Sequence, residues 1–135
     1  MDVEDVAPLV GSLACGAVVA ALVAPFVLVS NPGTELGLYY ASGPAGGTVL
    51  GFLAPIAVVV FLAGRRGRTD PVTAAGLTLV LGLGMLGLAA SWAFAVDPEL
   101  VFNFSAAWMG YHRWVVVGLT AFVPLSAGAY ARAVL

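Results

Sequence analysis

Four long apolar segments dominate the chain, and short polar or turn-forming stretches separate them. The segments cover residues 6–29, 44–63, 72–96 and 114–135. A helix needs roughly 20 residues, at about 1.5 Å per residue, to cross a hydrocarbon layer about 30 Å thick. The pattern therefore predicts an all-α membrane protein, with residues 1–135 forming a single domain that is a bundle of four transmembrane helices.

The stretches between the apolar segments differ in composition. Residues 30–33 contain proline and glycine, which end helical pairing, whereas residues 64–71 hold the densest cluster of charges. Between the third and fourth segments, Asp97, Pro98 and Glu99 have the order of a helix start: a capping acid, a proline at the first helical position and a second acid favoured by the helix dipole. Apolar residues then recur at helical spacing, which predicts a short interfacial helix over about 98–110 in the second outer loop.

Composition supports a membrane location. Hydrophobic residues make up 61% of the chain, charged residues make up 9%, and the mean hydropathy is +1.05, whereas an ordinary soluble domain is roughly 25% charged. The net charge of −2 gives no basic footprint for nucleic acid, so we expect none as a partner. The single cysteine, Cys15, excludes an intramolecular disulfide and a Cys-x-x-Cys redox pair.

Arginine placement predicts the orientation of the chain. Cytoplasmic loops of membrane proteins carry an excess of basic residues. Placing Arg65, Arg66 and Arg68 inside also places Arg132 inside and leaves only Arg113 outside. We therefore expect a multi-pass protein of the cell membrane with both termini in the cytoplasm.

Small residues recur four positions apart, which is the spacing at which membrane helices approach closely. Gly43, Gly47 and Gly51 share this spacing in the second segment, and Gly16 and Ala20 share it in the first. We interpret these stripes as helix-packing faces. They are typical of packing within one bundle, and the alternative is a face that pairs with another copy of the chain.

Ionisable chemistry is sparse. The four segments contain no Asp, Glu, Lys, Arg or His before Arg132, so no proton relay, catalytic site, cofactor site or metal site is expected, and we do not expect an enzyme. One possible site lies at the outer interface, where Tyr111, His112, Arg113 and Trp114 are adjacent. His112 could meet a quinone or a lipid headgroup there, although a lone interfacial histidine more often contacts headgroups without further function.

The two predicted outer loops share a faint pattern. Asn31-Pro32 followed by residues 35–41 parallels Asp97-Pro98 followed by residues 99–105. The pattern has two explanations: a tandem duplication of a helical hairpin, or chance similarity between loops of similar composition.

The function hypotheses follow from what the sequence lacks. The first is a non-catalytic subunit or scaffold of a membrane complex, whose partners are the lipid bilayer and either other membrane subunits or further copies of itself. The alternative is a small-solute permease or channel that acts as an oligomer, with Pro55 and Pro124 as flexible points. With arginine as its only basic residue type and an acidic start at Asp2-Val3-Glu4-Asp5, the composition resembles small four-helix membrane proteins of halophilic archaea. This resemblance implies a fold but no activity.

Overall fold

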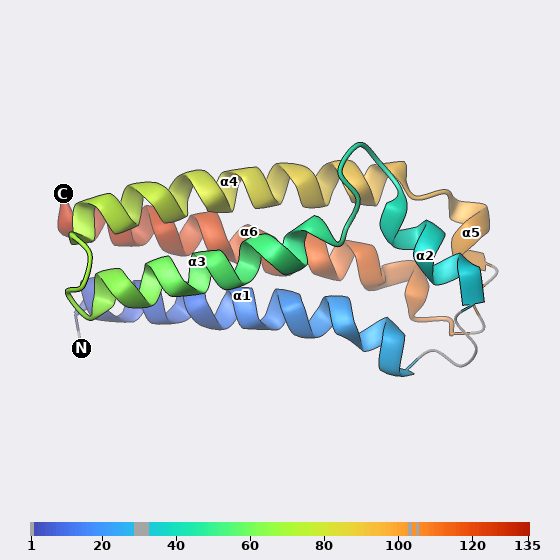
Figure 1. Cartoon of the computed structure of the whole chain (residues 1–135), viewed down its shortest axis with the longest axis horizontal. Helices are drawn as coiled ribbons and strands as arrows, with labels where there is room; N and C mark the ends of the chain where they lie inside the picture. The colour runs from blue at the N-terminus through green and yellow to red at the C-terminus, as the bar shows by residue number, and fades with distance from the viewer. Residues whose placement is uncertain (1, 29–32, 103, 105) are drawn as a thin grey trace.

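The computed structural model describes residues 2–28, 33–102, 104 and 106–135, and the described residues form helices and no strand (Figure 1). The elements are α1 (Val3–Leu28), α2 (Gly33–Ala41), α3 (Val49–Arg65), α4 (Pro71–Ala95), α5 (Pro98–Phe102) and α6 (Met109–Val134). Helices α1, α4 and α6 are each long and apolar enough to cross a membrane, and α3 is a shorter apolar helix of 17 residues. The prediction of an all-helical, multi-pass membrane protein is confirmed.

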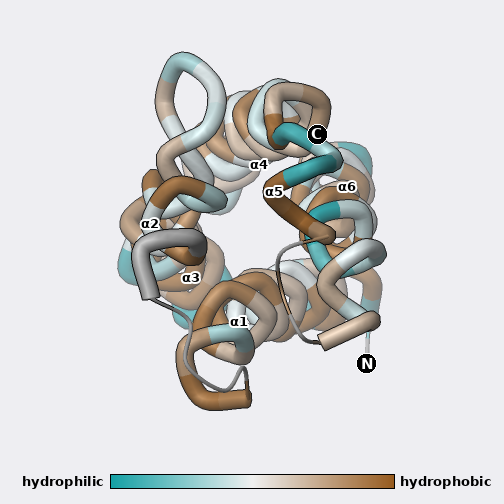
Figure 2. The backbone as a smooth tube through the Cα atoms, turned by 90° about the vertical axis from the view of Figure 1, so that its right-hand side faces the viewer, coloured by the Kyte–Doolittle hydropathy of each residue, from teal (hydrophilic) through white to brown (hydrophobic). Residues whose placement is uncertain are grey.

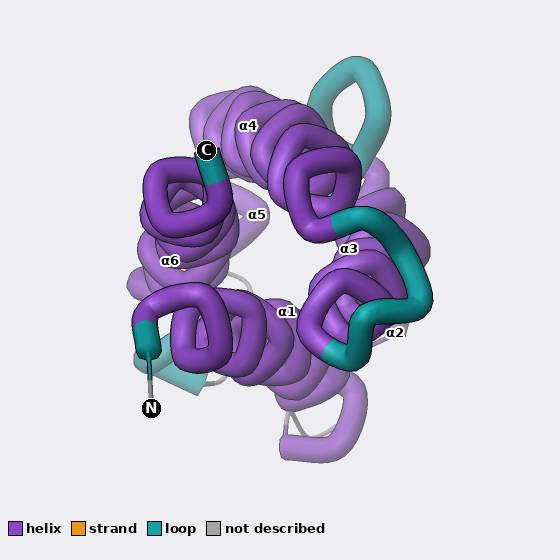
Figure 3. Tube along the Cα trace, turned by 90° about the vertical axis from the view of Figure 1, so that its left-hand side faces the viewer, coloured by secondary structure: helices purple, strands orange, loops and turns teal. Residues whose placement is uncertain are grey.

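The four long helices form a closed ring. Helix α1 packs against α3, α3 against α4, α4 against α6, and α6 against α1, so that α1 and α4 lie diagonally across the bundle. Figure 2 shows the ring from the end that carries α2 and α5, and Figure 3 shows it from the end that carries both termini. We call these the α2 end and the termini end. Successive long helices run in opposite directions, so the α3–α4 connection also lies at the termini end (Figure 1).

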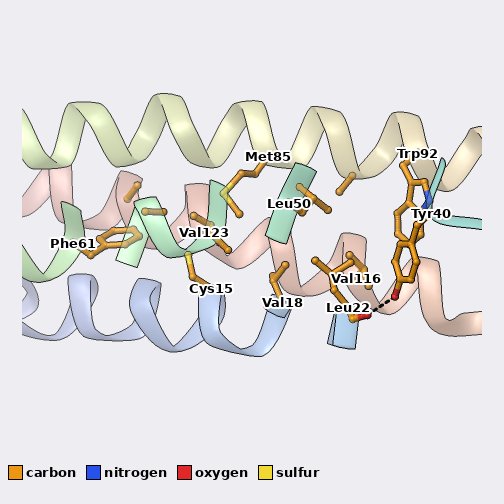
Figure 4. Close-up of a cluster of buried hydrophobic side chains, with 14 of the residues drawn as sticks. Cys15, Val18, Leu22, Tyr40, Leu50, Phe61, Met85, Trp92, Val116 and Val123 are labelled. Atoms are coloured by element: carbon orange, nitrogen blue, oxygen red, sulfur yellow. Dashed lines mark hydrogen bonds between the residues drawn. The ribbon is translucent and has the colours of Figure 1, made fainter. Parts of the chain in front are cut away.

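Apolar side chains fill the centre of the ring along its length (Figure 4). Those with no exposed surface include Cys15, Val18, Leu50, Phe61, Met85, Val116 and Val123. Glycines bring the helices together at defined places. A Cβ atom built on Gly82 of α4 would lie 2.7 Å from the backbone nitrogen of Pro124 in α6, and one built on Gly11 of α1 would overlap the ring of Phe61 in α3. Such contacts follow the general rule that small residues allow close approach of membrane helices.

The second span is shorter than predicted, and the prediction that its glycines lie on one helical face is wrong. Helix α3 begins at Val49 rather than at residue 44, because Gly43 and Gly46 have φ angles of +80° and +73° and the chain turns there. Gly43 and Gly47 therefore precede the helix on which Gly51 lies, and the three do not share a helical face. Gly47 is nevertheless a packing residue, since a Cβ atom there would lie 2.8 Å from the indole of Trp92.

The stripe in the first span lies on a different side of the helix from the bundle contacts. Gly16 and Ala20 are exposed, and nothing lies within 4 Å of a Cβ atom built on Gly16. The face of α1 that enters the bundle carries Gly11, Cys15 and Val18 instead. The interpretation of Gly16 and Ala20 as packing residues within one bundle is therefore wrong.

The short helices at the α2 end differ most from expectation. Asp97 does start a helix, since its Oδ1 accepts a hydrogen bond of 3.0 Å from the backbone nitrogen of Glu99. That helix, α5, ends at Phe102 rather than near residue 110, and α6 begins at Met109 rather than at residue 114. Helical spacing of apolar residues continues on both sides of the break, so periodicity alone cannot locate it. Helix α2 was not predicted, and residues 103 and 105 lie outside the described part.

The described elements repeat the same order twice: a long helix, a short helix and a long helix. Helices α1, α2 and α3 form the first set, and α4, α5 and α6 form the second. Corresponding long helices lie diagonally across the ring, as a twofold axis along the bundle would place them. Residues 31, 32, 103 and 105 of the sequence repeat lie outside the described part, and neither duplication nor chance similarity is tested by the structure.

The contact between Gly82 and Pro124 predicts that a methyl group added at Gly82 destabilises the bundle, whereas one added at Gly84 does not. Gly82→Ala should lower the free energy of unfolding by about 1–3 kcal/mol, because the new Cβ atom meets proline backbone that cannot move aside. Gly84→Ala is the matched control, since nothing lies within 4 Å of a Cβ atom at that position. Its stability should be unchanged or higher by up to about 1 kcal/mol, because alanine favours helix.

Thermal unfolding in detergent micelles, followed by circular dichroism, measures both variants. Equal stability of the two would contradict the close contact between α4 and α6.

Candidate functional site

Aromatic residues and the one histidine gather at the α2 end of the bundle. We call Tyr39, Tyr40, Trp92 and His112 the aromatic cluster. Tyr39 and Trp92 have no exposed surface, and Tyr40 and His112 expose 3% and 5% of theirs. Helix α2 supplies the two tyrosines, α4 supplies the tryptophan and α6 supplies the histidine. The cluster therefore joins three segments that are far apart in the sequence.

The rings pack face to face and edge to face. Tyr40 stacks between Phe26 of α1 and Trp92, with ring centres 5.3 and 5.7 Å apart. Tyr39 meets Trp92 edge to face at 5.2 Å. Figure 4 shows Tyr40 and Trp92 side by side in this arrangement. Gly47 makes room for it, because a Cβ atom there would lie 3.0 Å or less from both of these rings. Such aromatic pairs each add about 0.5–1.5 kcal/mol beyond the area that they bury.

A proline in α1 leaves a backbone carbonyl in need of a donor. In a regular helix the carbonyl of Ala21 accepts from the N–H of residue 25, but residue 25 is proline and has no N–H. Nε2 of His112 lies 2.6 Å from the Ala21 carbonyl oxygen. Because a carbonyl only accepts, Nε2 carries the proton and donates it. His112 thus supplies the hydrogen bond that Pro25 cannot.

The other ring nitrogen of His112 also has a partner. The hydroxyl of Tyr39 lies 2.8 Å from Nδ1. In a neutral imidazole that donates from Nε2, Nδ1 accepts, so the Tyr39 hydroxyl donates to it. His112 therefore links α6 to α1 through one nitrogen and to α2 through the other.

The remaining polar groups of the cluster are satisfied in the same way. The indole N–H of Trp92 donates to the main-chain oxygen of Tyr39 at 2.8 Å, and the Tyr40 hydroxyl donates to the main-chain oxygen of Leu22. Burial raises the pKa of both tyrosines above their ordinary range, so both hydroxyls keep their protons. A hydrogen-bonded network of this kind is what a water-poor environment requires of buried polar groups.

The four predicted site residues separate in the structure. His112 points into the bundle, whereas Tyr111 is 73% exposed and Trp114 is 41% exposed. The guanidinium carbon of Arg113 lies 5.5 Å from the ring centre of Trp114, as in a cation–π contact. Its Nε is buried and has no hydrogen-bond partner among the described residues. The four adjacent residues therefore do not form one site, and the sequence did not indicate the partners of His112.

Sequence reasoning did not connect His112 with Tyr39, Tyr40 or Trp92, or with the carbonyl that Pro25 frees. A signal existed for Pro25, because a proline inside a helix always frees the carbonyl four residues earlier. Nothing in the sequence identifies the donor that reaches that carbonyl, since Ala21 and His112 are 91 residues apart.

The arrangement leaves little room for chemistry at His112. Both ring nitrogens are engaged, so neither is free to bind a metal ion or to accept a proton from a substrate. Within residues 2–28, 33–102, 104 and 106–135, no group of three or more His, Cys, Asp and Glu side chains is placed to hold a metal ion. The cluster has the properties of a structural junction.

Replacing the histidine tests this role. His112→Phe keeps a planar ring but leaves the Ala21 carbonyl and the Tyr39 hydroxyl without partners, so the free energy of unfolding should fall by roughly 1–3 kcal/mol. Tyr111→Phe is the control, because Tyr111 is adjacent in sequence and faces outward; its stability should match that of the wild type. Thermal unfolding in micelles compares the two. Wild-type stability in His112→Phe would exclude the structural role.

Comparison with known proteins adds a family but no activity. No curated protein and no solved structure matches the chain. A family of unknown function, DUF7548, matches residues 1–135. The resemblance to small membrane proteins of halophilic archaea stays a prediction from composition. Because the match covers the whole length, the chain belongs to this family of unknown function.

Proposed function

We propose that the chain is a non-catalytic subunit or scaffold of a membrane complex. The observation that carries the proposal is the outward position of the small residues of α1. Gly16 and Ala20 lie one helical turn apart on the exposed face, between the exposed apolar side chains of Leu13 and Val23. Because bundle packing does not use this face, it is available to a helix of another membrane protein.

The interior of the bundle supports a scaffold rather than a transport path. The buried threonine hydroxyls are polar groups that could line such a path, but each bonds to its own helix. The Thr78 hydroxyl donates to the Ala74 carbonyl at 2.8 Å, and the Thr120 hydroxyl donates to the Val116 carbonyl at 2.7 Å. Apolar side chains fill the centre of the bundle (Figure 4). A permease would therefore need a path between copies of the chain.

The prolines give little support to the permease. Pro124 packs tightly against Gly82, which disfavours its use as a flexible point. Pro55 is exposed on the outer face of α3. A catalytic role is also disfavoured, because the ring nitrogens of the only histidine are both hydrogen-bonded within the chain.

We also propose that the termini end faces the cytoplasm. The fold brings Arg65 at the end of α3, and Arg66 and Arg68 of the α3–α4 connection, to the same end as Arg132. Arg113 lies near the start of α6 at the opposite end. This distribution follows the preference of cytoplasmic loops for basic residues.

Thiol labelling in intact cells tests the orientation. In a Cys15→Ser background, Thr69→Cys at the termini end should resist an impermeant maleimide until the cells are permeabilised. Gly37→Cys at the α2 end should react at once, since Gly37 is exposed and no described atom lies within 4 Å of its Cβ position. Reaction of Thr69→Cys in intact cells, with protection of Gly37→Cys, would reverse the orientation.

Co-purification tests the scaffold. A tagged wild-type chain, expressed in its native host and extracted in mild detergent, should retain a defined set of membrane proteins. Gly16→Leu should lose most of that set, because leucine fills the small-residue face without touching the rest of the bundle. Gly118→Leu is the matched control: it is also exposed, with nothing within 4 Å of its Cβ position, but it lies on α6.

Two results would count against the scaffold. One is a Gly16→Leu variant that retains the same proteins as the wild type. The other is selective flux of a small solute through liposomes that contain only the purified chain, which would favour the oligomeric permease.

A further inference from the structure

A polar pocket lies at the termini end of the bundle, opposite the aromatic cluster. Its volume is about 220 Å³, and its lining includes Glu4 and Asp5 of α1, Gly64 and Arg65 of α3, and Tyr130 of α6. All of the charged groups come from the last or first turns of these helices. The pocket therefore sits at the depth where a bundle that spans a membrane meets the lipid headgroups.

One side chain of the lining is a tyrosine that is otherwise buried in the bundle. Tyr130 is only 1% exposed, and its hydroxyl makes no hydrogen bond to another described residue, although the residue lines the pocket. The hydroxyl lies against Gly64, where an added Cβ atom would be 2.6 Å away. Because no other described residue bonds to this hydroxyl, it is free to bond to a polar group in the pocket.

The charges of the lining match a group that carries both signs. Glu4 and Asp5 supply two carboxylates to the lining and Arg65 supplies one guanidinium, so the lining has a net charge of −1. Nε of Arg65 donates to the main-chain oxygen of Asp5 at 3.0 Å, which fixes the guanidinium beside α1. The acidic side of the pocket and the Tyr130 hydroxyl suit an ammonium group, and Arg65 suits a phosphate.

An apolar groove lies at the same end, on the seam between α1 and α6. Its volume is about 470 Å³, and it is lined mainly by apolar side chains, among them Val3, Val6 and Val10 of α1 and Phe122 and Leu125 of α6. The first turns of α1 thus contribute acidic residues to the pocket and valines to the groove. An amphiphile with a short headgroup and an acyl chain matches this pairing of a polar and an apolar surface.

We propose that the termini end binds an aminophospholipid of the phosphatidylethanolamine type. Its primary ammonium donates hydrogen bonds to Glu4, Asp5 and the Tyr130 hydroxyl oxygen. Its phosphate lies at Arg65, and an acyl chain lies along the groove between α1 and α6. The site is separate from the Gly16 face and does not depend on the chain being a scaffold.

Lipid retention tests the proposal. The full chain is placed in nanodiscs of phosphatidylglycerol with equal amounts of phosphatidylethanolamine and phosphatidylcholine, then extracted in mild detergent, and retained lipids are counted by native mass spectrometry. Phosphatidylethanolamine and phosphatidylcholine have the same phosphate and acyl chains. The choline nitrogen, however, is fully methylated and cannot donate a hydrogen bond. The wild type should retain phosphatidylethanolamine over phosphatidylcholine by about tenfold, the equivalent of one charge-assisted hydrogen bond.

Two variants remove the recognising groups. Tyr130→Phe should reduce the preference several-fold, because it deletes only the hydroxyl oxygen and keeps the ring that packs in the core. Glu4→Gln combined with Asp5→Asn should abolish the preference while keeping the polar lining. Tyr111→Phe, which alters an exposed tyrosine at the opposite end, should keep the wild-type preference. Circular dichroism checks that each variant is folded.

Three outcomes would overturn the assignment. The first is equal retention of the two lipids by the wild type. The second is a wild-type preference in folded Tyr130→Phe together with the same preference in the folded double variant. The third is displacement of the retained lipid by ethanolamine in solution, since a free amine lacks the acyl chain that the groove is proposed to hold.

Discussion

The carbonyl of Ala21 needs a hydrogen-bond donor that its own helix cannot provide, because residue 25 is proline. In a membrane, little water is available to supply that donor. His112 supplies it from α6 and is itself oriented by the Tyr39 hydroxyl of α2. The short helix α2 therefore packs against the bundle for a physical reason: it completes a hydrogen-bonded chain that begins at a proline.

The same requirement accounts for the shape of the α2 end. Helix α3 has only 17 residues, because the chain before it forms a turn and not a helix. Gly43 and Gly46 have positive φ angles in this turn. Tyr40 occupies the end of the bundle beside that turn and stacks on Trp92, with Gly47 making room for both. Aromatic surface thus replaces the missing turn of helix, and each polar group of the aromatic cluster has a partner within the chain.

Sequence reasoning predicts the elements that depend on local composition and misses those that depend on distant contacts. The long apolar segments and the helix start at Asp97 follow from length and capping chemistry, and the structure has both. The Gly43 stripe failed because spacing cannot distinguish a helical glycine from one in a turn. The inward position of His112 could not be predicted, because its partners, Tyr39 and Ala21, are brought to it only by the folded bundle.

The account depends most directly on which nitrogen of His112 carries the proton. The chain has one histidine, so uniform ¹⁵N labelling of histidine reports on this residue alone. Solid-state NMR of the protein in lipid bilayers at neutral pH should show a neutral ring, with the proton on Nε2 and close to the Ala21 carbonyl carbon, and with Nδ1 unprotonated. A proton on Nδ1, or on both nitrogens, would contradict the junction between α1, α2 and α6.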